Sequence, residues 1–275
     1  MPTLADVSAL LFTPADDESK LVRALGGPGE GVIADLEDSV PVARRPAARA
    51  LVVDVFARPR GATLRLVRVN GTDTPFFEAD IEALASCDLD GLVLPKATPE
   101  ALAACGEVGP PVVALIETAA GLRAAYEIAS HPRVVALALG AVDLSADLSL
   151  EPLPAGDELL YARSQIVVDS RAAGLRRPFD SVQTELYDGA ALAREAERAR
   201  ALGFGGKLCI HPSQVECVRQ IFRGQLDVGW ARRVVEAYEE AVEHGRGAVA
   251  LDGEMIDLAV AERARSVLRL AEREA

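Results

Sequence analysis

Short apolar segments recur along the chain, and each is followed by a longer segment in which apolar residues return at helical spacing. Near-continuous apolar runs rich in β-branched residues are typical of parallel strands covered by helices, whereas antiparallel strands show polar residues at every second position. The candidate strands are SALLFT (8–13), GVIADLE (31–37), TLRLVRV (63–69), DGLVLP (90–95), PVVALIE (111–117), VVALALG (134–140), RPFDSV (177–182) and GKLCIH (206–211). Eight strand–helix units predict an α/β fold, the (β/α)8 barrel.

Capping residues support the helical segments between these strands. Thr98 followed by Pro99 predicts a helix start, and Asp188 predicts another, whose helix ends at Gly203. An open doubly wound sheet is the alternative fold. No G-x-G-x-x-G follows the first strand and no Walker motif is present, so the barrel is preferred.

The end of the chain is longer than a barrel needs, and no linker rich in Gly, Ser or Pro divides the sequence. We predict a catalytic TIM barrel over residues 1–225. A C-terminal helical extension over residues 226–275 is expected to pack on the barrel or on a neighbouring subunit. Within this extension, Asp252 and Gly253 predict a turn.

Composition narrows the classes of function. The chain has 275 residues and a formal net charge of −13, which argues against a nucleic-acid or anionic-membrane partner because phosphates are neutralised by clustered Lys and Arg. No signal-peptide pattern opens the chain, and no apolar run approaches the roughly 20 residues of a membrane helix. The cysteines form no C-x-x-C pair, so we expect buried, reduced thiols and a cytoplasmic protein; they are Cys87, Cys105, Cys209 and Cys217.

Polar residues gather where the predicted strands end. They are Asp35, Glu37, Asp38, Arg68, Asn70, Lys96, Glu117, Asp143, Asp180 and His211. In a barrel the carboxyl ends of all strands meet at one face, and active sites lie there. We therefore expect these side chains to surround a single mouth.

Glu117 and Asp143 form the sharpest pair, because each follows an apolar run and the two belong to neighbouring predicted strands. Two carboxylates in a dry site repel each other unless they are protonated or bridged by a cation. Oxygen ligation with few protein ligands fits Mg²⁺, and the lack of a neighbouring His argues against zinc. The alternative is that Glu117 only begins a helix and Asp143 only begins a turn.

Arg68 is expected at the same mouth. The odd spacing from Arg65 predicts that one of the two side chains faces the barrel interior and the other faces out. An inward Arg68 can hold a carboxylate or enolate oxygen, or pair with the acids of the second strand. Glu37 and Asp38 are candidates for an orienting role, and the alternative is that they only solvate the rim.

Two further candidates bear positive charge or a titratable ring. Lys96 after Pro95 is a candidate for phosphate binding, and a Schiff base is less favoured because no apolar cage surrounds it. His211 precedes Pro212 at a helix start, where it either faces an anionic ligand or caps the helix.

Eight stretches that run in order over nearly the whole chain are shared with a known family. They are LLFTPADD, IADLEDSVP, LRLVRVNGTDTPFFEADI, GLVLPKA, VVALIETAAGL, VVALALGAVDLSADL, GFGGKLCIHPSQ and LDGEMID. They resemble the citrate lyase β-subunit-like (CitE-like) members of the HpcH/HpaI aldolase family. The resemblance implies a (β/α)8 barrel, an oligomer that is often a trimer, Mg²⁺ at the mouth, and a carbon–carbon bond cleaved or formed between an acyl-CoA enolate and an α-keto acid.

The resemblance also implies roles for individual residues. Glu117 and Asp143 become the metal ligands, and Arg68 becomes the arginine that binds substrate and the transition state. Glu37 and Asp38 are placed near the site.

Two regions transfer less directly. Asp257 in DGEMID matches an acid that, in related malyl-CoA-type enzymes, reaches the mouth of a neighbouring subunit. The segment TPADDESK carries acids where many relatives have a Gly and an Arg, so phosphate recognition of CoA by this loop is in question, with Lys20, Arg44 and Arg45 as substitutes.

The sequence therefore predicts a Mg²⁺-dependent carbon–carbon lyase. It would cleave a β-hydroxyacyl thioester such as citryl-CoA or malyl-CoA to an acetyl thioester and oxaloacetate or glyoxylate, with Glu37 or Asp257 as the base. One alternative is a pyruvate-type aldolase of free keto acids that does not use CoA. Another is a subunit that requires an acyl-carrier protein for turnover. The expected partners are the thioester, the keto acid and, as a homotrimer, further copies of the chain.

Overall fold

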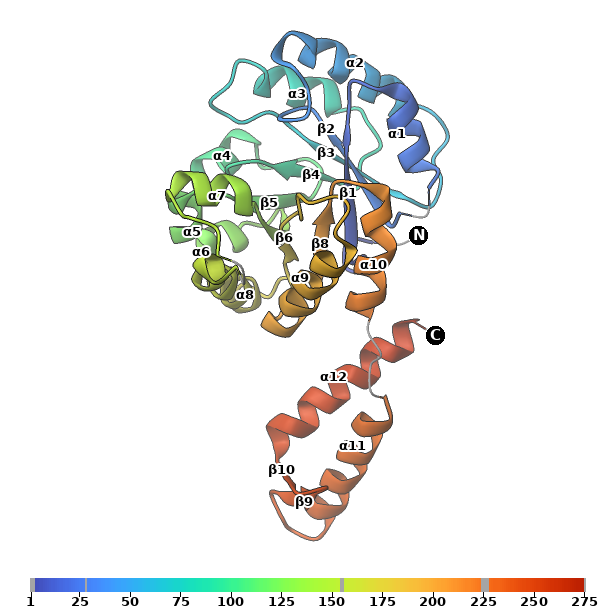
Figure 1. Cartoon of the computed structure of the whole chain (residues 1–275), viewed down its shortest axis with the longest axis vertical. Coiled ribbons are helices and arrows are strands. Elements are labelled where there is room, and N and C mark those ends of the chain that lie inside the picture. Colours follow the sequence, from blue (N-terminus) through green and yellow to red (C-terminus); the bar gives the residue numbers. More distant parts are fainter. Residues whose placement is uncertain (1–2, 28, 154–155, 224–227, 275) are drawn as a thin grey trace. The chain divides into compact units, whose positions relative to one another are not determined.

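The chain folds into two compact units, residues 1–222 and residues 223–275. The structure is a computed structural model that describes residues 3–27, 29–153, 156–223 and 228–274. The first unit is a closed barrel of eight strands with helices around it (Figure 1). The expected (β/α)8 barrel is confirmed, and the open doubly wound sheet is excluded.

The barrel strands follow one another in chain order, all pairs are parallel, and β8 pairs with β1 to close the ring. The strands are β1 (Ala9–Pro14), β2 (Gly31–Asp35), β3 (Leu64–Arg68), β4 (Gly91–Leu94), β5 (Val112–Ile116), β6 (Val134–Leu139), β7 (Phe179–Asp180) and β8 (Gly206–Cys209). The helices of this unit are α1 (Glu18–Leu25), α2 (Arg45–Phe56), α3 (Phe77–Leu84), α4 (Pro99–Ala104), α5 (Ala119–Arg123), α6 (Ala125–Ala129), α7 (Ala141–Asp147), α8 (Leu160–Ala172), α9 (Gly189–Leu202) and α10 (Pro212–Arg223).

Alternate strand residues fill the inside of the barrel. The interior cluster includes Leu10, Ile33, Leu64, Leu66, Val93, Val113, Leu115, Ala136, Ala138, Phe179 and Leu208. The residues between them pack in the larger cluster against the helices. Because side chains of a strand alternate between its two faces, Asp35, Arg68 and Glu117 take the next interior positions, at the carboxyl end of the barrel.

The predicted helix ends are confirmed. Oγ1 of Thr98 accepts a hydrogen bond from the N–H of Ala101 at 3.1 Å, and Oδ1 of Asp188 accepts one from the N–H of Ala191 at 2.8 Å. Gly203 ends α9 with a φ of +108°, a left-handed conformation that glycine adopts without steric cost.

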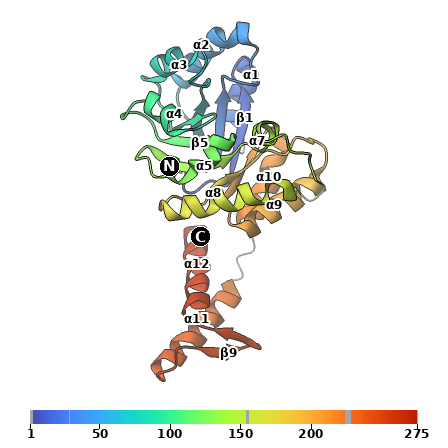
Figure 2. The same cartoon turned by 90° about the vertical axis from the view of Figure 1, so that its left-hand side faces the viewer.

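The second unit consists of two helices joined by a hairpin. These are α11 (Val228–Glu243), β9 (Val249–Leu251), β10 (Glu254–Ile256) and α12 (Leu258–Glu274). Helices α11 and α12 pack side by side in both views (Figures 1 and 2). Asp252 and Gly253 both have positive φ, +53° and +87°, so the predicted turn is confirmed; two positive values fit a tight hairpin turn. The two short strands that it joins were not predicted.

Across the described residues of both units, we find no helix with the length and apolar character needed to cross a membrane.

Candidate active site

Asp35 and Arg68 lie opposite each other on neighbouring strands at the barrel mouth. Arg68 donates from Nε to Oδ1 of Asp35 at 2.6 Å and from Nη2 to Oδ2 at 2.7 Å. The pair is nearly buried, with the Asp35 side chain 2% exposed and that of Arg68 10% exposed. Arg65 points the other way and donates to the carbonyl of Phe56 at 2.8 Å. The predicted opposite orientation of the two arginines is confirmed.

The segment after β2 brings two more carboxylates to Arg68. Nη1 of Arg68 donates to Oδ2 of Asp38 at 2.9 Å and lies 3.2 Å from Oε2 of Glu37. The guanidinium carbon also lies 4.8 Å from the centroid of the Phe12 ring. The Glu37 side chain is 7% exposed whereas that of Asp38 is 61% exposed, so Asp38 is the carboxylate with access to solvent.

These surroundings shift the pKa values of Glu37 and Asp35 in opposite directions. Burial raises the pKa of Glu37 to about 7; the charge of Arg68 opposes this rise, and the charges of Asp38 and Asp35 add to it. Burial acts on Asp35 too, but its hydrogen bonds to Arg68 and the charge of Arg68 keep the pKa of Asp35 below the usual value. The pair of Asp35 and Arg68 therefore stays ionised, while Glu37 exchanges a proton near neutral pH.

Glu117 follows β5 directly and is 2% exposed. Its Oε1 accepts a hydrogen bond from the backbone N–H of Lys96 at 2.7 Å. Lys96 has a φ of +46°, which is uncommon for a residue with a side chain. Burial raises the pKa of Glu117 to about 8; the Lys96 N–H opposes this, and the charges of Glu37 and Asp143 add to it. A negative charge on Glu117 is therefore poorly compensated by the protein alone.

Asp143 lies in the first turn of α7 and its side chain is exposed. The prediction that it stands at the end of a strand is wrong, because β6 ends before it and the chain enters a helix at once. Two hydrogen bonds hold α7 in place: the N–H of Ala141 donates to Oγ of Ser181 at 3.0 Å, and Oδ2 of Asp147 accepts from the N–H of Ala119 at 2.7 Å. Asp143 is thus fixed against the segments that follow β5 and β7.

Asp35, Asp38, Arg68, Glu117 and Asp143 line one cavity of about 400 Å³ at the mouth. Much of its wall is apolar and includes Phe12, Leu115, Leu139, Val182, Leu208 and Ile210. Within the described ranges, no group of three or more His, Cys, Asp or Glu residues is arranged to hold a metal ion. A cation in this cavity would take two protein carboxylates and complete its shell with water or ligand oxygens, which is the habit of Mg²⁺.

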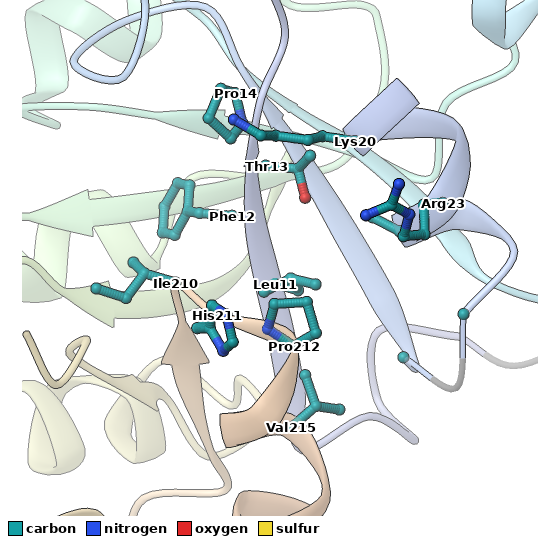
Figure 3. Close-up of a pocket in the computed structure, with 13 residues that line it drawn as sticks. Leu11, Phe12, Thr13, Pro14, Lys20, Arg23, Ile210, His211, Pro212 and Val215 are labelled. Carbon is teal, nitrogen blue, oxygen red and sulfur yellow. The ribbon is translucent and has the colours of Figure 1, made fainter. Parts of the chain in front are cut away.

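A second cavity of about 540 Å³ adjoins the first and shares Phe12, Pro14 and Ile210 with it. Figure 3 shows Lys20 and Arg23 extending from α1 at one side of this cavity. Two cationic side chains next to an acidic cavity suit a ligand that carries separate phosphate and carboxylate groups.

His211 lines this second cavity and not the acidic one. Its Nδ1 lies 2.7 Å from Oγ of Ser213 and accepts a hydrogen bond from the N–H of Ser213 at 3.2 Å, at the start of α10. Arg44 is held elsewhere, with Nη1 2.9 Å from Oδ2 of Asp16, and it lines neither of the two cavities. Of the predicted substitutes for phosphate binding, Lys20 is the one that the structure places in this cavity.

The prediction that Asp180 joins the mouth is wrong. Its Oδ1 accepts from Nε of Arg163 at 2.9 Å and its Oδ2 from Nζ of Lys207 at 3.0 Å. Phe179 occupies the interior position of β7, so the next residue faces the helices. The N–H groups of Asn70 are also not turned to a ligand, because its backbone and side-chain N–H groups both donate to Asp80.

Asp257 belongs to the second unit, where its Oδ1 accepts a hydrogen bond from the N–H of Val260 at 3.0 Å and caps α12. Its action at a barrel mouth stays a prediction. The Lys96 side chain is exposed and lines neither cavity, so the site uses its backbone.

Sequence reasoning placed Asp35 at the mouth and left a pair between Arg68 and the acids of the second strand as one alternative, but it assigned Asp35 no role of its own. It missed Ser181. Ser181 gave no signal, because its contact with α7 depends on two loops that meet only in the folded barrel.

The chain is a (β/α)8 barrel with an arginine and several acids at the carboxyl-terminal mouth, which is where the active sites of (β/α)8 enzymes lie. The fold and the site therefore place it in the class of (β/α)8 enzymes. Residues 8–212 match the family model for HpcH/HpaI aldolase/citrate lyase. The chain belongs to this family, and the family and the enzyme class expected from the sequence, a lyase, are confirmed.

Similar proteins extend over nearly the whole chain. A citrate lyase subunit beta of Leuconostoc mesenteroides subsp. cremoris is 35% identical over 95% of this chain and 92% of the relative. A (3S)-malyl-CoA thioesterase of Cereibacter sphaeroides is 34% identical over 96% of this chain and 94% of the relative. The crystal structure of CitE from Mycobacterium tuberculosis in complex with magnesium, acetoacetate and coenzyme A has a TM-score of 0.84 at 35% identity, covering 96% of this chain and 98% of that one.

A second structure of the M. tuberculosis citrate lyase beta subunit, complexed with oxaloacetate and magnesium, has a TM-score of 0.72 at 34% identity, covering 80% of this chain and 99% of that one.

Proposed function

We propose that this chain is a Mg²⁺-dependent carbon–carbon lyase. Its substrate is a β-hydroxyacyl thioester of the citryl-CoA or malyl-CoA type, which it cleaves to an acetyl thioester and oxaloacetate or glyoxylate. The observation that carries the proposal is that Glu117, Asp143 and Arg68 line one cavity, which adjoins a second cavity with cationic side chains. The structures of M. tuberculosis CitE with magnesium and coenzyme A or oxaloacetate support it.

Glu117 and Asp143 are the residues that would hold the metal ion. Glu117 fits this role because it is a buried carboxylate with a pKa raised to about 8, and its orientation is fixed by the Lys96 N–H. A divalent cation beside it would compensate its charge. Bound there, Mg²⁺ supplies Lewis-acid polarisation and orientation of the keto-acid oxygens.

Arg68 and Glu37 supply the remaining chemistry. Glu37 removes the proton of the β-hydroxyl group; its pKa is raised to about 7, and its Oε2 has no hydrogen-bond partner among the described residues. As the carbonyl forms, the carbon–carbon bond breaks and its electron pair remains on the acetyl thioester as an enolate, which then takes the proton from the Glu37 carboxyl group and leaves Glu37 ionised again. Arg68 stabilises the oxyanion charge that develops in this step. Asp257 of a neighbouring copy is the second candidate for the proton transfer.

The second cavity favours a thioester over a free keto acid. Lys20, Arg23 and His211 would meet the phosphates of the carrier arm, and Phe12 and Ile210 would flank the passage to the acidic cavity. A pyruvate-type aldolase has no use for such a cavity. The exposed side chain of Lys96 remains a candidate for binding a phosphate of the substrate.

The relatives also support proposals about assembly. Several are named as a subunit beta of citrate lyase, which favours a partner that carries the acyl group. We propose a homotrimer, in which Asp257 serves a neighbouring mouth; light scattering of the purified protein tests the subunit number. The four cysteines are free thiols, as expected in a reducing compartment, and a cytoplasmic location stays a prediction.

Turnover of citryl-CoA and malyl-CoA with Mg²⁺ tests the function. Release of acetyl-CoA with oxaloacetate or glyoxylate supports a lyase, whereas free CoA with citrate or malate identifies a thioesterase. Turnover only after an acyl-carrier protein is added identifies a partner-dependent subunit. Arg68→Ala should lower kcat by about 10²–10³, and an unchanged kcat would remove Arg68 from the transition state.

A further inference from the structure

Asp35 has every acceptor position of its carboxylate occupied. Oδ1 accepts from Nε of Arg68 at 2.6 Å and from the N–H of Glu37 at 3.0 Å, and Oδ2 accepts from Nη2 of Arg68 at 2.7 Å and from the N–H of Ser39 at 3.1 Å. A carboxylate offers about four lone-pair positions, so Asp35 has none left for a metal ion or a substrate proton. Its function must lie in what it holds.

Arg68 is held by one edge. Its Nε and Nη2 atoms face Asp35, and Nη1 faces the exposed Asp38. Of the five N–H groups of a guanidinium, three are thus engaged in hydrogen bonds, and Nη1 also has Oε2 of Glu37 3.2 Å away. The Nε side of Arg68 is closed to any ligand, and a substrate oxygen can approach only from the Nη end.

The same carboxylate also fixes the segment after β2. The N–H groups of Glu37 and Ser39 both end on Asp35, on either side of Asp38. This segment carries the carboxylates of Glu37 and Asp38 to within 3.2 Å and 2.9 Å of Nη1 of Arg68. One buried acid therefore sets the relative positions of two functional groups on different strands.

We propose that Asp35 is a positioning residue of the reaction: it locks the Arg68 guanidinium and the segment of Glu37 and Asp38 into one unit, so that Arg68 meets substrate with its Nη end. The proposal rests on the proposed function for the identity of the substrate. It assigns Asp35 no contact with substrate or metal.

Asp35→Asn is the first test, because it keeps the size of the side chain but turns one acceptor into a donor that faces Arg68. The guanidinium is then released. We expect kcat/KM for the thioester to fall about 10²-fold through kcat, as for a misplaced catalytic group, and oxaloacetate affinity to fall about tenfold. Mn²⁺ affinity at Glu117 and Asp143 should stay within about twofold, since neither ligand touches Asp35.

Asp90→Asn is the matched control. Asp90 also accepts from an arginine, Nη2 of Arg60 at 2.5 Å, and from a backbone N–H, that of Arg65 at 2.8 Å, but it precedes β4 and lies at the opposite end of the barrel. Its variant should keep the kinetic constants of the wild type. If Asp35→Asn also keeps them, or if both variants lose activity equally, Asp35 has only a structural role and the proposal is overturned.

Non-additivity separates positioning from general damage. In an Arg68→Lys background there is no guanidinium to lock and only the anchoring of the Glu37 and Asp38 segment is left, so adding Asp35→Asn should lower kcat/KM by about tenfold or less. A further loss of about 10²-fold in that background would overturn the proposal, because Asp35 would then act without Arg68.

Oxaloacetate binding distinguishes this proposal from the proposed function. If the wild type cleaves no thioester, the lyase assignment fails, but calorimetric titration of oxaloacetate with Mg²⁺ still compares Asp35→Asn with Asp90→Asn. Equal affinities would overturn the role of Asp35.

A measurement on the wild type remains decisive if Asp35→Asn does not fold. In protein labelled with ¹⁵N arginine, the Arg68 Nε–H should exchange slowly with solvent and should stay so when Mg²⁺ and oxaloacetate are added. Release of this proton into fast exchange on adding the ligand would show that Asp35 does not hold Arg68 during binding, and it would overturn the proposal.

Discussion

Gly140 leaves the space that Glu117 occupies. A Cβ added at position 140 would lie 2.5 Å from Oε2 and 2.5 Å from Cβ of Glu117. The second of these atoms sits next to the backbone of the barrel and cannot move aside without moving β5. The absence of a side chain at the end of β6 is thus a condition for the orientation of the proposed metal ligand.

Gly140→Ala should therefore weaken metal binding before it affects anything else in the site. We expect Mn²⁺ affinity to fall about 10- to 100-fold, as for displaced supports of metal ligands, and stability to fall by about 1–3 kcal/mol from overpacking. Gly189→Ala is the control, because a Cβ there meets no atom within 4 Å. Equal Mn²⁺ affinities of the two variants would contradict the role of Gly140.

Glu117 predicts a pH dependence of stability in the metal-free protein. Its pKa is raised to about 8 in the folded state, above the ordinary value of 4.5, so the folded protein binds this proton more tightly than the unfolded chain does. The contribution of Glu117 to the free energy of unfolding is therefore complete below about pH 4.5. It is lost as pH rises towards 8, because the Glu117 carboxylate must then carry a buried charge. Glu117→Gln has no such loss and should exceed the wild type by a few kcal/mol at pH 8 but not at pH 4.5.

Urea unfolding in EDTA at both pH values measures this difference. The exposed Glu107 provides the control variant, Glu107→Gln, which should follow the wild type at both pH values. Addition of Mg²⁺ at pH 8 should stabilise the wild type and not Glu117→Gln. Parallel curves for the wild type and Glu117→Gln would show that the Glu117 carboxylate is not buried as described.

The fold was predictable because its signals are local and repeated. Apolar runs of strand length between helical segments, with caps at Thr98 and Asp188, identify strand–helix units without any knowledge of contacts between them. The weak points are β7, which was predicted as a strand of six residues and has two, and the hairpin of β9 and β10, whose strands of three residues carry too little periodicity to be recognised.

The site was predictable only in part. Arg68 and Glu117 follow from strand alternation, which extends the interior face to the strand ends. The prediction for Asp180 was wrong because β7 is so short that the sequence does not show which of its residues face the barrel interior. The roles of Asp35 and of the Lys96 N–H depend on contacts between strands, and sequence spacing alone does not show which backbone groups point into the mouth.

Residues of the second cavity are expected to affect binding of the carrier arm, measured as KM, and not the chemical step, measured as kcat. Lys20→Ala and Arg23→Ala should each raise KM for a CoA thioester about tenfold, because each removes a charged hydrogen-bond donor to phosphate, and should leave kcat unchanged. An acyl thioester of N-acetylcysteamine, which has no phosphate, should not distinguish these variants from the wild type.

Arg44→Ala serves as the comparison, because Arg44 pairs with Asp16 and lines neither cavity. If Arg44→Ala raises KM for the CoA thioester and the α1 variants do not, the phosphates bind outside this cavity.

The buried ion pairs between β7, β8 and the outer helices should matter for stability. Asp180 is 1% exposed and joins Arg163 to Lys207, whose side chain is fully buried and has Glu195 as its other carboxylate partner, at 3.2 Å. Asp180→Ala leaves two cations with less compensation, and we expect a loss of about 3–5 kcal/mol in urea unfolding. Asp88→Ala breaks a pair whose acid is 61% exposed and should cost about 1 kcal/mol or less. Similar losses for the two variants would mean that water reaches Lys207, and that the space between β8 and α9 is less tightly packed than the structure indicates.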